Sequence, residues 1–276
     1  SYFSREIPME SVDLVVMYTD GLAEARAGGS LFGEDRIIKA AERELAAPPD
    51  VLCKALLDAA KDHAGGIIDD DTVSLSNLQR QIAHGTADIG RPKTESAAEA
   101  ALRINPDIEI VQHKERLTAE NALKIVSQYE VVADGCDNFA TRFLVNDACY
   151  FAKVPLVSAA VGQFEGQIAT FRAFETDEGG KPKPNYGDFV GATPPPGSVP
   201  TCEEAGVMGA LTGVVGSLQA LEVIKEITGA GESLAGRIPI YDALDTRFRT
   251  VKLKWDPENP LTGENPTIRD LSVHAA

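Results

Sequence analysis

Side chains that could bind a nucleotide gather first in one short stretch of the sequence. An acidic triplet, residues 69–71, is followed by Asn77 and Arg80, which lie three residues apart. An amide and a fork-shaped guanidinium at this spacing can face one ligand, and phosphate oxygens suit both groups. Val73 and Leu75 alternate with polar residues, which predicts a strand with carboxylates at its end and a polar loop beyond. Ligands of open α/β sheets bind at such strand ends, although an acidic triplet can also be a solvated edge.

A lysine lies at the start of the next predicted helix. The sequence Gly90-Arg91-Pro92-Lys93 precedes a helix over 94–104, and Thr94 and Ser96 are expected to satisfy free backbone N–H groups at its start. Lys93 near the positive end of this helix raises the potential where an anion could bind. The alternative is an ordinary surface lysine.

A further candidate carboxylate follows another strand. Residues 129–134 form a predicted strand that ends in acid, and Gly-Cys-Asp-Asn-Phe-Ala-Thr-Arg at 135–142 opens a helix. This order places Asp137 at the rim of the sheet, where its carboxylate could hold Mg²⁺ bridged to a triphosphate. Asp137 could instead cap the helix.

One cysteine ends a long loop. Residues 176–201 are rich in Gly, Pro and Asp, and long loops without regular structure in compact domains are usually functional. Cys202 follows, close to the start of a predicted helix over 207–228, whose N-terminus would favour the thiolate, although Glu203 and Glu204 oppose this. Cys202 is therefore either reactive or incidental. The small residues in the first half of that helix predict close packing against another element.

The elements that position these groups alternate between strands and helices. Further strands are predicted at 108–111 and 154–160, two more around Gly166 within 162–174, and a pair at 237–242 and 249–255. The N-terminal part differs, because a strand at 12–18 is followed by two amphipathic helices, 34–46 and 49–64. The sequence therefore predicts an α/β protein preceded by a strand-helix-helix segment.

Composition limits the kinds of partner. The net charge of −16 over 276 residues argues against nucleic acid, which needs a basic surface. No apolar run is long enough to span a membrane and no signal peptide is apparent, which predicts a cytoplasmic protein. The four cysteines lie far apart with no Cys-x-x-Cys pair, so neither a disulfide framework nor a zinc knuckle is indicated.

Together, these motifs resemble a known family. The run Ser-Asn-Leu-Gln-Arg-Gln after Asp-x-Asp, the sequence Gly-x-Pro-Lys, and Asp-Asn-Phe-Ala-Thr-Arg are similar to those of the MoeB, ThiF and HesA adenylating enzymes, relatives of the ubiquitin-activating enzymes. The resemblance covers residues 69–276. It implies that Asp69 holds the ribose of ATP, that Asn77, Arg80 and Lys93 bind its phosphates, and that Asp137 binds Mg²⁺.

The resemblance also implies a fold and a reaction. The fold is Rossmann-like with a mainly parallel sheet, but the family's usual first strand and Gly-x-Gly-Gly-x-Gly loop have no counterpart here, since the glycines at 28, 29 and 33 lie far from the strand at 12–18. The reaction is ATP-dependent adenylation of the C-terminal glycine of a small ubiquitin-like sulfur-carrier protein, by a homodimer. We expect loss of the loop to impair it. The carrier could serve molybdopterin, thiamin or another sulfur pathway, and Cys202 matches the cysteine that ThiF-like relatives link to the carrier.

Many members of that family carry two Cys-x-x-Cys pairs for structural zinc. One pair follows the strand near Phe174 and the other lies near residues 259–263. This chain has neither, so no zinc is expected.

Residues 1–68 resemble a different family. The wording Leu-Val-Val-Met-Tyr-Thr-Asp-Gly, followed by Leu-Phe-Gly-Glu-Asp, is similar to the C-terminal part of SpoIIE/RsbU-type metal-dependent protein phosphatases, which indicates a chimera. In that family such aspartates bind metal ions, here Asp20 with Asp70 or Asp71. A phosphatase remnant is therefore the alternative function. A third is a dimer that binds the carrier without catalysis.

Overall fold

The computed structural model describes residues 26–27, 30–31, 64–192, 206–229 and 231–275. The chain divides into two compact units, Ser1–Ala64 and Gly65–Ala276. In the first unit, β1 (Arg26–Ala27) and β2 (Ser30–Leu31) form an antiparallel pair. The predicted strand at 12–18, the predicted helix at 34–46 and all but the last residue of that at 49–64 lie outside the described residues.

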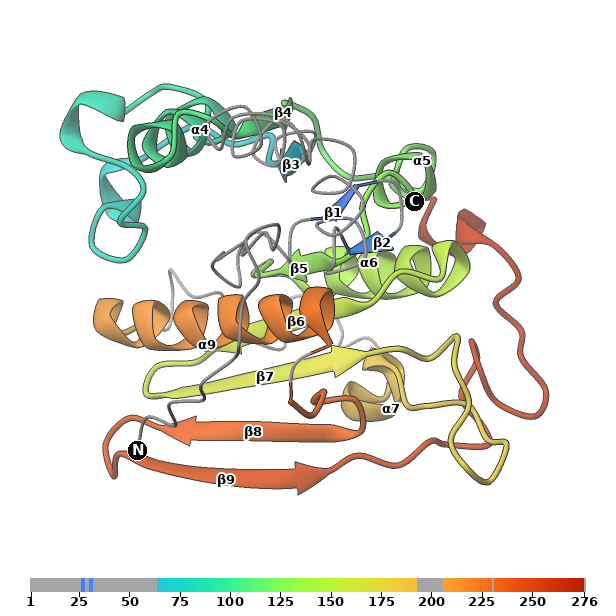
Figure 1. Ribbon diagram of the computed structural model, residues 1–276. Helices are drawn as coiled ribbons and strands as arrows, with labels where there is room; N and C mark the ends of the chain where they lie inside the picture. Colours follow the sequence, from blue (N-terminus) through green and yellow to red (C-terminus); the bar gives the residue numbers. More distant parts are fainter. Residues whose placement is uncertain (1–25, 28–29, 32–63, 193–205, 230, 276) are drawn as a thin grey trace, which may run out of the picture. The chain divides into compact units, whose positions relative to one another are not determined.

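The described residues of the second unit form two separate sheets. The first joins β3 (Ala64–Ile68), which begins at the unit boundary, with β4 (Glu109–His113), and α4 (Lys93–Ile104) lies between them in sequence. The second sheet has five strands in the order β5-β6-β7-β8-β9 (Figure 1). Their bounds are β5 (Val132–Asp134), β6 (Leu156–Val161), β7 (Glu165–Phe171), β8 (Arg237–Asp242) and β9 (Arg247–Lys252).

Pairing in the five-stranded sheet changes along its width. Strands β5 and β6 pair in parallel, because α6 (Phe139–Ala152) carries the chain back between them. The pairs β6–β7, β7–β8 and β8–β9 are antiparallel. The predicted α/β class is confirmed, and this sheet is mixed, with its parallel part at β5–β6.

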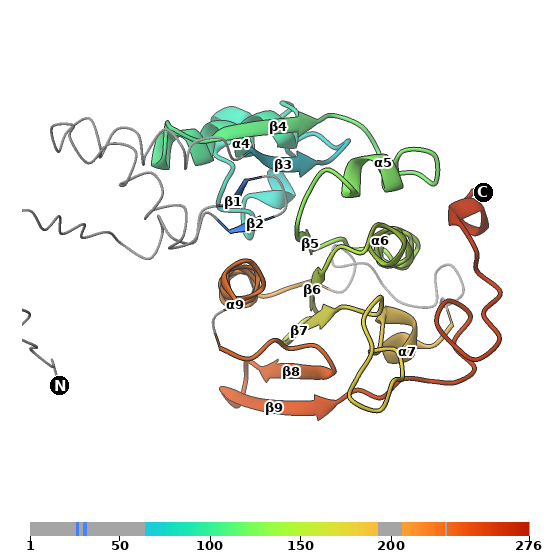
Figure 2. The ribbon, with the colours of Figure 1, turned by 45° about the vertical axis from the view of Figure 1, so that its right-hand side comes forward.

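Helices cover both faces of this sheet (Figure 2). Helix α9 (Gly209–Thr228) lies on one face, and α6 and α7 (Tyr186–Val190) lie on the other. Successive side chains of β6 point to opposite faces of the sheet. Leu156 therefore packs into the hydrophobic cluster on the α6 side, and Val157 packs into the cluster that contains Leu211 of α9. Among the described helices, none is both long and apolar enough to cross a membrane.

Three predictions about local structure were wrong. The strand placed at Val73 and Leu75 lies earlier, as β3, and residues 75–77 form a short 3-10 helix, η1 (Leu75–Asn77). The loop predicted over 176–201 contains α7, whose first N–H groups are satisfied by Asn185. These two differences arise because polar side chains cap short turns that hydrophobic periodicity does not reveal. The third is at Gly166, where one continuous strand, β7, replaces the two predicted strands because Gly166 is itself paired within the sheet.

Candidate functional site

The structure brings Lys93 to the acidic triplet. Residues 71–73 run beside residues 90–93 and exchange three backbone hydrogen bonds. As a result, Lys93 Nζ lies 2.7 Å from Asp71 Oδ2 and 3.7 Å from Asp69 Oδ2. Asp69 Oδ1 also accepts a hydrogen bond from the backbone N–H of Asp71 at 2.8 Å. A cation and two carboxylates therefore share one partly exposed surface after β3.

The same triplet is the only group of three acidic side chains in the described part of the chain whose ligand atoms lie close enough to share a metal ion. Its carboxylate oxygens come within 4.8 Å of one another. However, the Lys93 ammonium already supplies a positive charge to two of the three carboxylates. Asp20, the expected partner in a phosphatase site, lies outside the described residues. The described contacts therefore favour an ion-paired surface over a metal centre.

Asn77 and Arg80 both have partners within their own turn. Asn77 is buried, and its Oδ1 accepts a hydrogen bond from the Ser74 backbone N–H at 3.0 Å, so it caps η1. Arg80 donates from one guanidinium nitrogen to the Ser76 carbonyl at 2.9 Å. A guanidinium has five N–H donors, so Arg80 retains donors for a ligand.

The start of α4 differs from the sequence prediction. Thr94 and Ser96 do not cap this helix, because Pro92 occupies the N-cap position and offers no side-chain acceptor. Ser96 Oγ instead lies 2.8 Å from His84 Nδ1, and Thr94 Oγ1 is buried without a hydrogen-bond partner. Burial and the nearby Lys93 charge hold the pKa of His84 below its ordinary value, which favours the neutral imidazole.

Asp137 is exposed after β5 and has no polar partner within the described residues. The loop that carries it is held from both sides. The Cys136 N–H donates to Asp134 Oδ1 at 2.8 Å, and the Cys136 carbonyl accepts from Arg142. Asn138 caps α6 by accepting from Thr141 N–H at 2.8 Å, so Asp137 is not the cap. This leaves the Asp137 carboxylate free for a ligand on a fixed loop.

A buried ion pair that the sequence did not reveal fixes this loop. Arg142 donates to Asp134 Oδ2 at 3.0 Å, to Ser158 Oγ at 2.9 Å and to the Ala159 carbonyl at 2.7 Å. Asp134 is 3% exposed and Arg142 is 8% exposed. In the sequence, the signal for this ion pair was an acidic residue at the end of a predicted strand with an arginine eight residues later. The pair ties the carboxyl end of β5 to the middle of β6.

Helix α9 contacts both parts of the candidate site. Thr212 Oγ1 donates to the Arg80 carbonyl at 3.1 Å, and Gln219 Nε2 donates to the Asp134 carbonyl at 2.9 Å. Seven residues are about two helical turns, so Thr212 and Gln219 share a face and lie about 10 Å apart along the axis. Gly209 permits the close contact, because a Cβ there would lie 2.0 Å from the Gln79 carbonyl oxygen. One rigid helix therefore positions the Arg80 segment relative to the end of β5.

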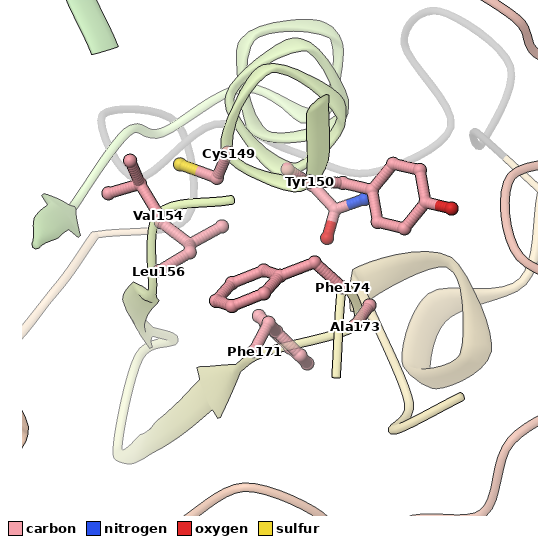
Figure 3. A pocket seen from close by; sticks show the side chains of 8 residues that line it. Cys149, Tyr150, Val154, Leu156, Phe171, Ala173 and Phe174 are labelled. Atoms are coloured by element: carbon pink, nitrogen blue, oxygen red, sulfur yellow. The ribbon is translucent and has the colours of Figure 1, made fainter. Parts of the chain in front are cut away.

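The described cysteines do not form a reactive centre. Burial raises the pKa of both Cys136 and Cys149 well above the ordinary range of a thiol. Cys149 lines an apolar cavity of about 10 Å³ beneath α6 (Figure 3), which is far too small for a nucleotide. Cys202 lies outside the described residues.

Two family models match the chain. The model of the ThiF family matches residues 65–261, and that of stage II sporulation protein E (SpoIIE) matches residues 1–76. The two matches overlap at residues 65–76, which include the acidic triplet.

Several curated proteins are similar to the ThiF-like part. A sulfur carrier protein adenylyltransferase of Thermus thermophilus is 43% identical over 211 residues, which cover 76% of this chain and 77% of that protein. The probable adenylyltransferase/sulfurtransferase MoeZ of Mycobacterium tuberculosis is 46% identical over 195 residues, or 71% of this chain. The match covers 49% of MoeZ, so the chain spans about half the length of that relative.

Solved structures share the fold. The crystal structure of Escherichia coli MccB with MccA-N7isoASN superposes with a TM-score of 0.60 at 17% identity, over 77% of this chain and 62% of that one. The crystal structure of E. coli MccB with ATP gives a TM-score of 0.57 at 17% identity, over 73% of this chain and 59% of that one. These likenesses support the Rossmann-like fold predicted from the sequence.

Proposed function

Because the chain belongs to the ThiF family, we propose that it uses ATP to adenylate the C-terminal glycine of a small ubiquitin-like sulfur-carrier protein. The observation that carries this proposal is the arrangement after β5, where an exposed carboxylate stands on a fixed loop. The name of the Thermus relative supports the choice of a sulfur carrier. The proposed site lies within residues 65–261, the part that resembles the family.

In the proposed reaction, a carboxylate oxygen of the carrier's C-terminal glycine attacks the α-phosphorus of ATP. A new bond joins that oxygen to the α-phosphorus, and the bond from the α-phosphorus to the oxygen bridging to the β-phosphate breaks. The products are a carrier acyl-adenylate and pyrophosphate. The protein has two tasks in such a step, which are to align the carboxylate and to reduce the repulsion between two anions.

Each proposed residue role follows from its charge and its freedom to bind. Lys93 and Arg80 supply positive charge to the phosphates, and Asn77 orders the turn that carries Arg80. Asp69 would accept from the ribose hydroxyls. Asp137 would hold the Mg²⁺ that accompanies ATP, because its oxygens are hard ligands and are not engaged elsewhere in the described chain. Cys202 remains a proposed site of attachment for the carrier.

The proposal is tested by pyrophosphate exchange. The protein is incubated with ATP, Mg²⁺, labelled pyrophosphate and a bacterial sulfur carrier that ends in Gly-Gly, and label in ATP is measured. We expect exchange with this carrier and none with the same carrier lacking its last two residues. Carrier binding that is indifferent to ATP, with no exchange, would instead establish a non-catalytic carrier-binding protein. The same assay reports whether the chain is active without the family's glycine-rich loop.

We also propose that the protein is a homodimer that pairs through α9. The face of α9 turned away from the sheet carries exposed Val214, Leu221 and Ile224, with small residues between them. Sedimentation velocity should show a dimer, and Leu221→Glu should shift the protein toward monomer. The matched control is Leu123→Glu, because Leu123 is exposed at 43% on α5 (Ala122–Val126).

A further inference from the structure

A cluster of buried polar side chains joins two segments that are far apart in the sequence. Asn185 and Asp188 lie at the start of α7, and Asn259 and Thr262 lie in the C-terminal segment. Each pair has a spacing of three residues. We call these four residues the polar clasp. Asn185, Asn259 and Thr262 are 1%, 4% and 6% exposed, so the clasp is largely shielded from water.

Hydrogen bonds connect the two pairs directly. Asn185 Nδ2 donates to Thr262 Oγ1 at 2.9 Å. Asn259 Nδ2 donates to Asp188 Oδ1 at 2.8 Å and to Asn185 Oδ1 at 3.2 Å. Because the amide of Asn259 contacts both residues of the other pair, the four side chains form one connected network.

Backbone groups occupy the remaining oxygens of the clasp. Asp188 Oδ2 accepts from the Asn185 N–H at 2.7 Å, and Asn259 Oδ1 accepts from the N–H groups of Leu261 and Thr262 at 2.9 and 3.1 Å. These oxygens already point at protein donors. A cation at the centre would therefore have to break several of these bonds.

This cluster occupies the regions where the resemblance noted above implies zinc. In that resemblance, two Cys-x-x-Cys pairs follow the strand near Phe174 and lie near residues 259–263, with the same spacing as the two clasp pairs. Structural zinc takes thiolate and imidazole ligands, whereas the clasp offers two amides, a hydroxyl and one carboxylate. This set of side chains does not fit zinc. The hydrogen bonds within the clasp join the two segments instead.

We propose that the polar clasp replaces a structural zinc site in this chain and fastens the C-terminal segment to α7 without any metal. The segment then continues to α6, where Leu271 is buried and His274 Nε2 lies 2.8 Å from Asp147 Oδ2. The clasp and this second contact hold the C-terminal segment at both of its ends.

The first test measures metal and chelation. Protein produced in zinc-supplemented medium is analysed by plasma mass spectrometry, and its melting temperature is compared with and without EDTA. We expect far less than one equivalent of any metal and no change in melting temperature. One equivalent of bound metal, with a lower melting temperature in EDTA, would overturn the proposal.

The second test breaks the network at its centre. Asn259→Ala removes the two hydrogen bonds that Nδ2 donates and the two that Oδ1 accepts, so we expect a loss of roughly 5 to 10 °C in melting temperature. Asn105→Ala is the matched control, because the Asn105 side chain only accepts from the Asp107 N–H in an exposed turn. Equal effects of the two substitutions would contradict the role of the clasp.

The third test converts the clasp to a metal site. Asn185, Asp188, Asn259 and Thr262 are all replaced by cysteine, and the variant is refolded with Co²⁺ and Zn²⁺. If the four positions converge as described, the variant binds about one equivalent of metal, with the thiolate-to-cobalt absorption of a tetrahedral site. A variant that keeps the wild-type circular dichroism but binds no metal would show that the positions do not converge. If the variant does not fold, the first two tests decide.

Discussion

An aspartate lies at the carboxyl end of β3 and another at that of β5, and the environments of these two aspartates are opposite. Asp69 after β3 remains partly exposed and shares the Lys93 ammonium with Asp71. Asp134, the last residue of β5, is 3% exposed and is bound by Arg142, Ser158 and a backbone N–H. A carboxylate at the end of a strand is therefore not necessarily a ligand. After β5, the residue free for a ligand is Asp137, three positions further on.

The two ion pairs have different tasks, because the exposed pair of Asp69 can bind a ligand and the buried pair of Asp134 stabilises the fold. A surface ion pair contributes little to stability and can exchange one partner for a ligand. A buried ion pair is costly to break, because the remaining charge is left without a partner. We therefore expect substitutions after β3 to change binding, and substitutions at Asp134 and Arg142 to change stability.

The largest expected effect is that of Asp134→Ala. Removing this carboxylate leaves the Arg142 guanidinium buried without its counter-charge, which costs about 3 to 5 kcal/mol of unfolding free energy. Chemical denaturation measures this loss. Asp69→Ala serves as the control, and we expect it to cost less than about 1 kcal/mol. Similar losses for the two variants would refute the contrast between the strand ends.

A smaller effect is expected at the contact between α9 and the Arg80 segment. Gly209→Val places side-chain atoms against the Gln79 carbonyl, so the segment must move, at a cost of about 1 to 3 kcal/mol. Gly213→Val is the control, because a Cβ at Gly213 meets nothing within 4 Å. We expect only the first variant to bind MgATP more weakly than wild type. Equal MgATP binding by the two variants would show that the contact of α9 with the Arg80 segment does not affect the nucleotide site.

Lys93→Gln should weaken MgATP binding about tenfold, or about 1.4 kcal/mol, with little change in stability. Arg91→Gln is the control, because Arg91 is engaged by Asp88 and Glu99. Isothermal titration measures both. If the Lys93 ammonium serves only its ion pair with Asp71, the two variants will bind MgATP alike.

The smallest expected effect concerns His84. Burial and the Lys93 charge hold the folded pKa of His84 below 6.5, so the folded state binds a proton less readily than the unfolded chain. This contribution to stability is complete above pH 6.5 and is lost as the pH falls through the folded pKa. NMR titration should give a value below 6.5 that rises in Lys93→Gln and falls further in Asp88→Asn. A value unchanged by both substitutions would show that these charges do not act on His84.

The sequence was sufficient to predict the helices and strands that follow hydrophobic periodicity. The helix after Asp137, the strand at 154–160 and the paired strands after residue 237 were predicted within a few residues of α6, β6 and the β8–β9 pair. Apolar spacing determines such elements locally. The family motifs also located the candidate site residues along the chain.

Contacts between distant residues could not be predicted in this way. The bond from Asn259 to Asn185 spans 74 positions, and neither residue belongs to a recognised metal or catalytic pattern. The acid that ends β5 was seen, but its partner Arg142 was not, because only the folded helix turns that guanidinium toward the sheet. Polar side chains that serve structure and those that serve ligands look alike in a sequence.

The most direct test of the account is calorimetric titration of MgATP into wild type, Asp137→Asn and Asp107→Asn. Asp107 is an exposed carboxylate in a turn away from the proposed site, so it controls for net charge. We expect wild type and Asp107→Asn to bind alike, and Asp137→Asn to bind at least about tenfold more weakly. Equal binding of MgATP by all three proteins would show that the Asp137 carboxylate does not hold the Mg²⁺ of MgATP.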